Sequence, residues 1–270
     1  MIELPESYVL AEQINRILKG KTIINAEANH TPHKFAWYSE NMADYPKKLA
    51  GKTITGAHVY SGSLRIRAED TVLLISTPVR YHTAGEKLPP KHQLFIEFGD
   101  STAITCTVQM WGCLFCFGEG DRNGLPVQHI VRDCPSPLED GFDEKYFMSL
   151  SADPKLSVKA FLATEQRIPG LGNGVLQDIL WTAKIHPKRT LSSLSEAEYK
   201  EMYTSVKSVL KEMVLKGGRD TERDLLGRPG GYKTILSRNT ADKPCPACGT
   251  IIKKEAYLGG SIYYCEKCQK

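Results

Sequence analysis

Residues 168–195 read IPGLGNGVLQDILWTAKIHPKRTLSSLS, and this stretch decides how the C-terminal half of the chain folds. One proline and three glycines fall within residues 169–174, which predicts a tight turn. The apolar residues that follow recur at helical spacing, so the turn leads directly into a helix. Backbone N–H groups at such a helix start can hold a phosphate, although a plain turn between two helices explains the same residues. Because no strand precedes the turn, a dinucleotide-binding fold is excluded.

The middle of the chain is predicted to be helical. Ser195 and Glu198 form a capping box for the longest helix, and Gly217-Gly218 ends it. Apolar residues spaced at i, i+3 and i+4 mark four helical segments, at 143–153, 157–166, 174–185 and 196–218.

The last residues, 245–270, read CPACGTIIKKEAYLGGSIYYCEKCQK and contain two C-x-x-C pairs. Cys245 and Cys248 form the first pair, and Cys265 and Cys268 form the second. This spacing is typical of a structural four-thiolate Zn²⁺ site, closed to catalysis. The residues between the pairs suit a hairpin that turns at Gly259-Gly260. One structural Zn²⁺ is therefore the expected cofactor.

Positive charge is concentrated near the C-terminus. Residues 216–270 contain 11 Lys and Arg against 6 Asp and Glu, a net charge of +5, although the whole chain carries only +4. Such an excess indicates an anionic partner, such as a nucleic-acid backbone, or a solvated surface with no partner. No apolar run is long enough for a membrane span and no secretory signal is recognisable, so the expected location is the cytoplasm.

The first part of the chain shows a helix and short strands. Residues 6–20 read as an amphipathic helix that ends at Gly20. The strands are predicted within SLRIRAED, TVLLISTPV, HQLFIEFGD and STAITCTVQM, which together cover residues 63–79 and 92–110.

The turn segment 168–195 resembles the helix–two-turn–helix of the formamidopyrimidine-DNA glycosylase/endonuclease VIII family. That family also ends in a four-cysteine zinc hairpin and begins with Pro-Glu-Leu-Pro-Glu, which IELPE at residues 2–6 resembles. The resemblance covers the whole chain. It implies an α+β fold: an N-terminal β-sandwich with a leading helix, a helical helix–two-turn–helix domain and a zinc-finger hairpin. The corresponding segments are a β-sandwich domain at 1–135, a linker at 136–150, the helical domain at 151–240 and the zinc finger at 241–270.

The resemblance also implies a DNA-binding apparatus. Asn173 matches the family asparagine that holds a phosphate of the lesion strand, and Lys159 matches a lysine that contacts the backbone. His92 matches a histidine that touches DNA, and Tyr232 matches a tyrosine near the damaged-base pocket of some members. Trp111 stands at the position of a side chain that fills the gap left by a flipped base.

The catalytic positions depart from the family pattern. The family nucleophile is an N-terminal proline, whereas this chain has Ile2, and a bulky second residue predicts that Met1 is retained. The candidate catalytic residues are Met1 as the amine, with Glu3 and Glu6 as acids. The family lysine on an early hairpin aligns near Gly62, and its zinc-hairpin arginine aligns with Gly260.

Two functions follow from these observations. The first is a base-excision-repair glycosylase and abasic-site lyase that excises an oxidised base, with an altered amine or water as nucleophile. The second is a non-catalytic binder of abasic, bent or flexible DNA, or of structured RNA. Both predict nucleic-acid binding. The expected partner is double-stranded DNA, damaged or abasic, and the chain is expected to be a monomer that associates with the nucleoid when bound to DNA. The missing proline, lysine and arginine predict that the standard chemistry is weak or absent.

Overall fold

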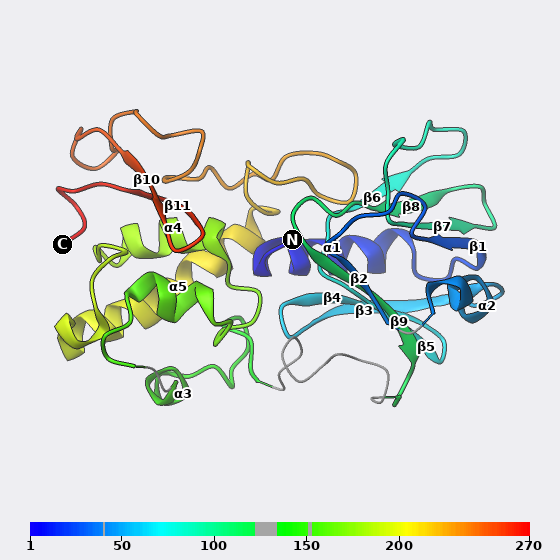
Figure 1. Ribbon diagram of the computed structural model, residues 1–270, viewed down its shortest axis with the longest axis horizontal. Coiled ribbons are helices and arrows are strands. Elements are labelled where there is room, and N and C mark those ends of the chain that lie inside the picture. The colour runs from blue at the N-terminus through cyan, green and yellow to red at the C-terminus, as the bar shows by residue number, and fades with distance from the viewer. Residues whose placement is uncertain (40, 122–133, 151–152) are drawn as a thin grey trace. The chain divides into compact units, whose positions relative to one another are not determined.

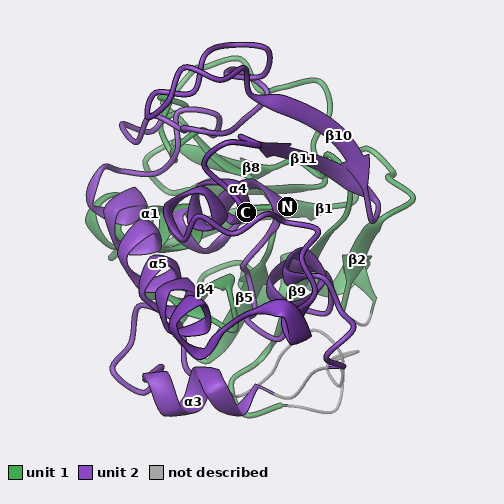
Figure 2. Ribbon diagram, turned by 90° about the vertical axis from the view of Figure 1, so that its left-hand side faces the viewer, with its two compact units in different colours: residues 1–2, 6–132, 223–229 green, residues 3–5, 133–222, 230–270 purple. Residues whose placement is uncertain are grey.

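The computed structural model describes residues 1–270 except 40, 122–133 and 151–152. The chain divides into two compact units, which Figure 2 colours separately. Unit 1 consists of residues 1–2, 6–132 and 223–229. Unit 2 consists of residues 3–5, 133–222 and 230–270, so that a short N-terminal segment belongs with the C-terminal half.

Unit 1 contains the leading helix α1, a second short helix α2 and two β-sheets (Figure 1). The strand order is β1-β7-β8-β6 in the first sheet and β2-β9-β5-β4-β3 in the second, and among the described strands of these sheets only the β2–β9 pair is parallel. The elements are α1 (Leu4–Ile17), β1 (Ile23–Ala28), β2 (Ala36–Tyr38), the 3-10 helix η1 (Met42–Asp44), α2 (Tyr45–Leu49), β3 (Ile54–Tyr60), β4 (Ser63–Ala68), β5 (Thr71–Ile75), β6 (Val79–His82), β7 (Leu94–Phe98), β8 (Ala103–Cys106) and β9 (Gly112–Gly118).

Both sheets of unit 1 contribute to one apolar core. Alternate residues of β7 are fully buried, as period-2 strands require when one face of a sheet is covered. Ile14 of α1, Ile66 of β4, Ile96 of β7 and Leu114 of β9 all belong to this core. The predicted β-sandwich with a leading helix is therefore confirmed, and the helix ends before Gly20, whose φ of +87° suits a glycine.

Unit 2 is helical apart from its C-terminal hairpin (Figure 1). The capping box of Ser195 and Glu198 forms as predicted, and Gly217 and Gly218 end the longest helix with φ of +74° and +93°. The elements are α3 (Glu144–Ser149), the π-helical turn η2 (Ala160–Thr164), α4 (Asn173–Thr182), the 3-10 helix η3 (Leu191–Ser193), α5 (Glu196–Leu215), β10 (Lys253–Tyr257) and β11 (Gly260–Tyr264).

One turn differs from the sequence-based expectation. The hairpin turns at Leu258-Gly259, with φ of +46° and +73°, while Gly260 pairs with Tyr257 inside the ladder. Positive φ at both central residues is typical of a type I′ turn, and this turn lies one residue earlier than predicted. Residues 136–150, the expected linker, lie in unit 2 and include α3, which falls within the helix expected at 143–153.

Candidate nucleic-acid interface and metal centre

The N-cap residue of helix α4 is Gly172, which has no side chain that could cap the helix. The first N–H groups of the helix therefore need an acceptor from elsewhere in the chain. Glu3 supplies that acceptor: its carboxylate accepts the N–H of Gly174 at 2.9 Å and that of Val175 at 2.8 Å. An anion at a helix N-terminus is favoured by the helix dipole as well. The expected phosphate cradle is thus occupied by the chain's own carboxylate.

Glu3 also pairs with an arginine that the sequence analysis did not single out. Nη1 of Arg219 lies 3.3 Å from Oε2 of Glu3, and the two side chains are only 4% and 13% exposed. Neighbouring glycines make room for this pair. A Cβ atom on Gly174 would lie 1.9 Å from Arg219 Nη1, and one on Gly172 would lie 2.5 Å from the Glu3 carboxyl carbon. The glycines of the turn therefore admit a buried ion pair.

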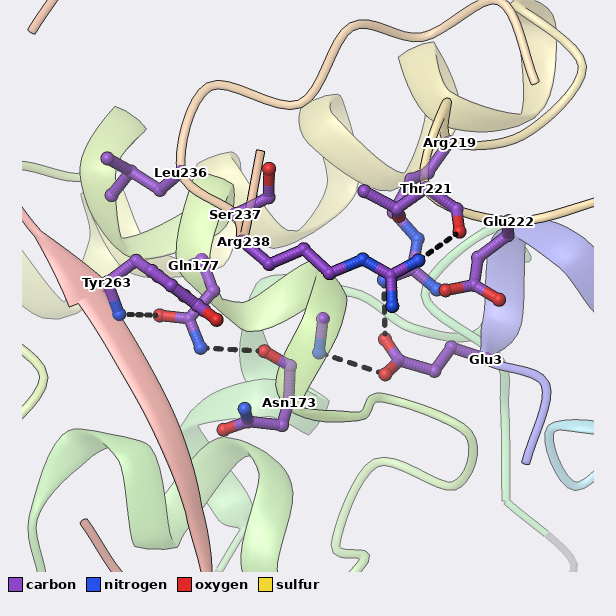
Figure 3. A pocket seen from close by; sticks show the side chains of 11 residues that line it. Glu3, Asn173, Gln177, Arg219, Thr221, Glu222, Leu236, Ser237, Arg238 and Tyr263 are labelled. Atoms are coloured by element: carbon purple, nitrogen blue, oxygen red, sulfur yellow. Dashed lines mark hydrogen bonds and ion pairs between the residues drawn. The ribbon is translucent and has the colours of Figure 1, made fainter. Parts of the chain in front are cut away.

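The pocket beside this ion pair belongs wholly to unit 2 (Figure 3). Its wall includes the exposed Arg238, whose Nη2 donates to the carbonyl of Thr221 at 3.3 Å. Asn173, one of the predicted DNA-binding residues, also lines it. The lining residues are Glu3, Asn173, Gly174, Gln177, Arg219, Thr221, Glu222, Leu236, Ser237, Arg238 and Tyr263.

Asn173 connects α4 to the C-terminal hairpin. Its Nδ2 donates to the carbonyl of Ser261 at 2.6 Å, whereas its buried Oδ1 has no hydrogen-bond partner among the described residues. Gln177, one turn later, donates to the same carbonyl at 3.2 Å and accepts the N–H of Tyr263 at 3.0 Å. Both side chains lie one turn apart on α4, so together they connect the helix to β11. The unused Asn173 oxygen still needs a donor.

Lys159 is buried against the same hairpin. The residue is 3% exposed. Its ammonium donates to the carbonyls of Tyr257 and Leu258 at the turn. It also lies 5.6 Å from the centre of the Tyr257 ring. Burial lowers the pKa of Lys159. The predicted backbone-contacting lysine thus holds the hairpin tip in this structure.

The four cysteines of the tail converge as the spacing predicts. The Sγ atoms of Cys245 and Cys268 lie 3.8 Å apart, and those of Cys248 and Cys265 lie 3.4 Å apart. Sulfurs bound at about 2.3 Å to one tetrahedral metal ion are separated by roughly 3.8 Å. All four ligand atoms lie within 4.8 Å of one another, so the cluster fits a single metal ion.

A buried carboxylate in α4 positions the segment that follows α5. Asp178 is fully buried and accepts the N–H groups of Ile235 and Leu236 at 2.9 and 2.7 Å. Burial raises the pKa of Asp178 to about 6. Because the folded chain then binds this proton more tightly than the unfolded chain, the contribution of Asp178 to stability falls as pH rises from about 4 to about 6. Tyr232 lies beside it, 4% exposed, and burial also raises its pKa.

The remaining predicted residues belong to unit 1. His92 is 5% exposed and stacks on His30, whereas Trp111 is 37% exposed. Glu6 is 4% exposed and Met1 is partly buried.

Ile2, at the position of the family nucleophile, is only 6% exposed and packs in the core of unit 1. Its N–H donates to the carbonyl of Ser76 at 2.9 Å, so this nitrogen is held by the backbone.

Sequence reasoning missed Arg219, Gln177 and Asp178. The adjacent Gln177-Asp178 pair within the otherwise apolar run VLQDIL was the available signal, because buried polar residues need specific partners. Arg219 gave no signal, since its partner Glu3 is more than 200 residues away in the sequence.

This chain is similar to known proteins in sequence. Residues 134–224 match the model of the formamidopyrimidine-DNA glycosylase H2TH domain. The chain is 27% identical to the formamidopyrimidine-DNA glycosylase of Lactobacillus gasseri, over all of this chain and 99% of that protein. It is 29% identical to the enzyme of that name from Rhodococcus jostii, over all of this chain and 96% of that protein.

Solved structures agree over the full length. The Lactococcus lactis protein Fpg, crystallised with DNA that contains an abasic site, superposes with a TM-score of 0.83 at 25% identity, covering 99% of each chain. The same protein in complex with Fapy-dG-containing DNA gives the same TM-score and identity. The β-sandwich, the helix–two-turn–helix segment and the four-cysteine hairpin together define the class of helix–two-turn–helix DNA glycosylase folds. Within this class, the chain is similar over its full length to formamidopyrimidine-DNA glycosylases, and residues 134–224 match the H2TH domain of that family.

No helix among the described residues is both long and apolar enough to cross a membrane.

The Glu3–Arg219 pair gives a first testable prediction. Replacing Glu3 by Gln removes the carboxylate that pairs with the buried guanidinium of Arg219, and breaking such a pair costs about 3–5 kcal/mol. We therefore expect E3Q to lower the free energy of unfolding, measured by urea denaturation, far more than the double variant E3Q/R219M does. Equal losses in E3Q and E3Q/R219M would show that the ion pair contributes nothing beyond the cap.

Proposed function

We propose that this chain recognises double-stranded DNA at a damaged or abasic nucleotide, and that it does so without the Schiff-base chemistry of its family. The observation that carries this proposal is the state of the N-terminus. Ile2 replaces the proline nucleophile, its side chain is buried and its nitrogen donates to Ser76. The binding half of the proposal rests on the relatives, whose structures were determined with abasic-site or Fapy-dG-containing DNA.

The loss of chemistry follows from distance. The α-amine of a retained Met1 lies one residue before the family nucleophile, a displacement of about 3.5 Å along the chain. A misplacement of about 1 Å already costs on the order of a hundredfold in rate. Glu3 gives no obvious substitute, because both of its oxygens accept N–H groups of α4 while it faces Arg219. In this structure the Glu3 side chain binds the start of α4 and Arg219, both of which belong to unit 2.

The binding apparatus is better preserved than the catalytic one. The unused Oδ1 of Asn173 marks a polar group that a ligand or water must satisfy. Arg238 is exposed beside it, and the region from 216 onward carries a net charge of +5. A positive surface beside a pocket suits a phosphate backbone. His92, Trp111, Lys159, Asn173 and Tyr232 remain the residues proposed to act in DNA binding.

The metal at Cys245, Cys248, Cys265 and Cys268 is proposed to be one structural Zn²⁺. Its support is the four-thiolate donor set and sulfur separations close to those of a tetrahedral zinc site. A small hairpin with few buried residues gains its folding energy from such an ion. We further propose that the chain acts as a monomer in the cytoplasm, bound to the nucleoid.

A second candidate function is a glycosylase or lyase that uses the primary amine of Met1. A primary α-amine has a pKa near 8 and can form an imine with an opened sugar. The retention of two acids near the N-terminus, Glu3 and Glu6, favours this alternative. The side chain of Glu6 is buried.

Borohydride trapping separates the two functions. We expect the chain to bind an abasic duplex in a fluorescence-anisotropy titration but to form no covalent adduct when borohydride is added. An adduct that maps to Met1 or to an exposed Ile2 by mass spectrometry would establish the lyase instead. Intact mass of the untreated protein reports whether Met1 is retained, and a matched structured RNA tests whether DNA is the preferred duplex.

The clamp predicted around α4 can be tested with matched variants. Asn173→Ala removes a polar side chain at the pocket, and we expect affinity for the abasic duplex to fall by about 10- to 100-fold, the worth of a hydrogen bond to a charged group. Lys159→Met keeps the buried alkyl stem but removes the charge, and it should weaken binding in the same direction. Asn239→Ala, at an exposed site in the same unit, is the control and should bind normally. Unchanged affinity in N173A, at an unchanged melting temperature, would remove α4 from the interface.

Zinc has its own prediction. Cys248→Ala should reduce the zinc content, measured by mass spectrometry of the metal, by one ion per chain and lower the melting temperature, because the closed four-ligand site supplies folding energy. Cys134→Ser is the control, since Cys134 lies outside the cluster. Full thermal stability in metal-free protein would contradict a structural role for the metal.

A further inference from the structure

Three potential metal ligands meet in unit 1, in a place that no motif of the sequence predicted. Glu27 lies on β1, His30 follows the end of that strand, and His92 precedes β7. One ligand atom from each residue lies within 4.8 Å of the others. We propose that Glu27, His30 and His92 bind a divalent transition-metal ion, with Zn²⁺ as the expected occupant.

The backbone holds the two histidines next to each other. The N–H of Asn29 donates to the carbonyl of Gln93 at 2.7 Å, and the N–H of Thr31 donates to the carbonyl of His92 at 3.0 Å. The Gln93 side chain also donates to the carbonyl of Thr31 at 2.9 Å. Asn29 takes a positive φ of +62°, a conformation that asparagine tolerates and that turns the chain at this point. These bonds extend the β1–β7 ladder, so His30 and His92 are positioned by the sheet itself.

His92 has the protonation pattern of a metal ligand. Its Nδ1 lies 3.0 Å from the carbonyl of Pro89, and a carbonyl only accepts hydrogen bonds. Nδ1 therefore carries the hydrogen, and in the neutral ring Nε2 keeps its lone pair. A backbone carbonyl on the non-coordinating nitrogen is the usual way in which proteins orient a ligating imidazole. With only 5% of the residue exposed, the ring is fixed.

His30 and Glu27 supply the adjustable part of the site. The His30 ring stacks on that of His92, with centroids 4.3 Å apart and planes 4° apart. Its Nδ1 lies 3.0 Å from Oε1 of Glu27, and the side chains of His30 and Glu27 are 44% and 52% exposed. Parallel rings do not aim two lone pairs at one point, so the exposed His30 ring turns toward the ion on binding. Exposed side chains change rotamer within nanoseconds, so this adjustment is fast.

The donor set selects the kind of ion. Two imidazoles and one carboxylate suit Zn²⁺, Ni²⁺ or Cu²⁺, whereas Mg²⁺ and Ca²⁺ prefer oxygen ligands alone. Three protein ligands leave a fourth tetrahedral position open, unlike the closed four-thiolate cluster of unit 2. The alternative is a solvated surface in which Glu27 and His30 merely form an ion pair three residues apart, worth little at this exposure. The proposed metal site and the plain ion pair predict different numbers of bound metal ions per chain.

The test counts metal ions per chain and needs no DNA, so its outcome is independent of the proposed function. Untagged full-length protein is dialysed against buffered Zn²⁺, and bound zinc is measured by mass spectrometry of the metal. We expect two zinc ions per native chain and one in His30→Ala and in Glu27→Gln at the same free zinc. The affinity of the second site should fall by more than the roughly 10- to 100-fold that outer-shell changes cost.

His33→Ala is the matched control. His33 lies in the same loop, but it is outside the cluster and its Nδ1 accepts the N–H of Phe35. It should keep two zinc ions. Co²⁺ gives a second readout: bound at this site it lacks the sulfur-to-metal charge-transfer bands of the four-thiolate cluster, and it broadens the NMR signals of the His30 and His92 rings. One zinc ion in the native chain, or a second ion that survives His30→Ala, would overturn the proposal.

Discussion

The contact between Glu3 and the first turn of α4 underlies the arrangement of unit 2. The helix starts at a glycine and has no side-chain cap of its own, so two of its N–H groups depend on a carboxylate that arrives from the N-terminus. The backbone reinforces this contact, since the N–H of Leu4 donates to the carbonyl of Gly170 at 2.9 Å. The guanidinium of Arg219 pairs with the same carboxylate, and the arginine side chain is only 4% exposed to water. Removing one member of a buried ion pair is strongly destabilising, so Glu3 contributes to keeping this charge buried.

This contact also constrains what the N-terminus can do chemically. In the family pattern the first residues carry the nucleophile and an acid, and both need freedom to reach a sugar. Here the carboxylate of the acid accepts two backbone N–H groups and takes part in an ion pair, and a hydrogen bond to a charged group is worth about 1.5–3 kcal/mol. The residue before it, Ile2, is anchored in the core of unit 1. The first residues therefore contribute to the packing of the fold, which supports the proposal of recognition without excision.

Local signals in the sequence were enough to predict most of the fold. The capping box at Ser195, the glycine stop after α5, the alternation of β7 and the cysteine spacing each depend on residues close together in the chain, and each was confirmed. Apart from the one-residue shift of the hairpin turn, what the sequence did not reveal involves contacts distant in sequence. Arg219 has no local pattern, because its meaning comes from a carboxylate 216 positions earlier. The glycines near α4 fitted either a phosphate cradle or a plain turn between two helices, and only the structure shows that the carboxylate of Glu3 lies against them.

The C-terminal hairpin lies directly against the start of α4. A Cβ atom on Gly260 would lie 3.4 Å from Nδ2 of Asn173, which is an ordinary contact distance. Asn173 and Gln177 donate to the carbonyl of Ser261, and Lys159 donates to the carbonyls of the turn. These three side chains therefore bind the backbone of the hairpin. The position of the hairpin on α4 then depends on polar side chains that come from outside the hairpin, as the start of α4 depends on Glu3.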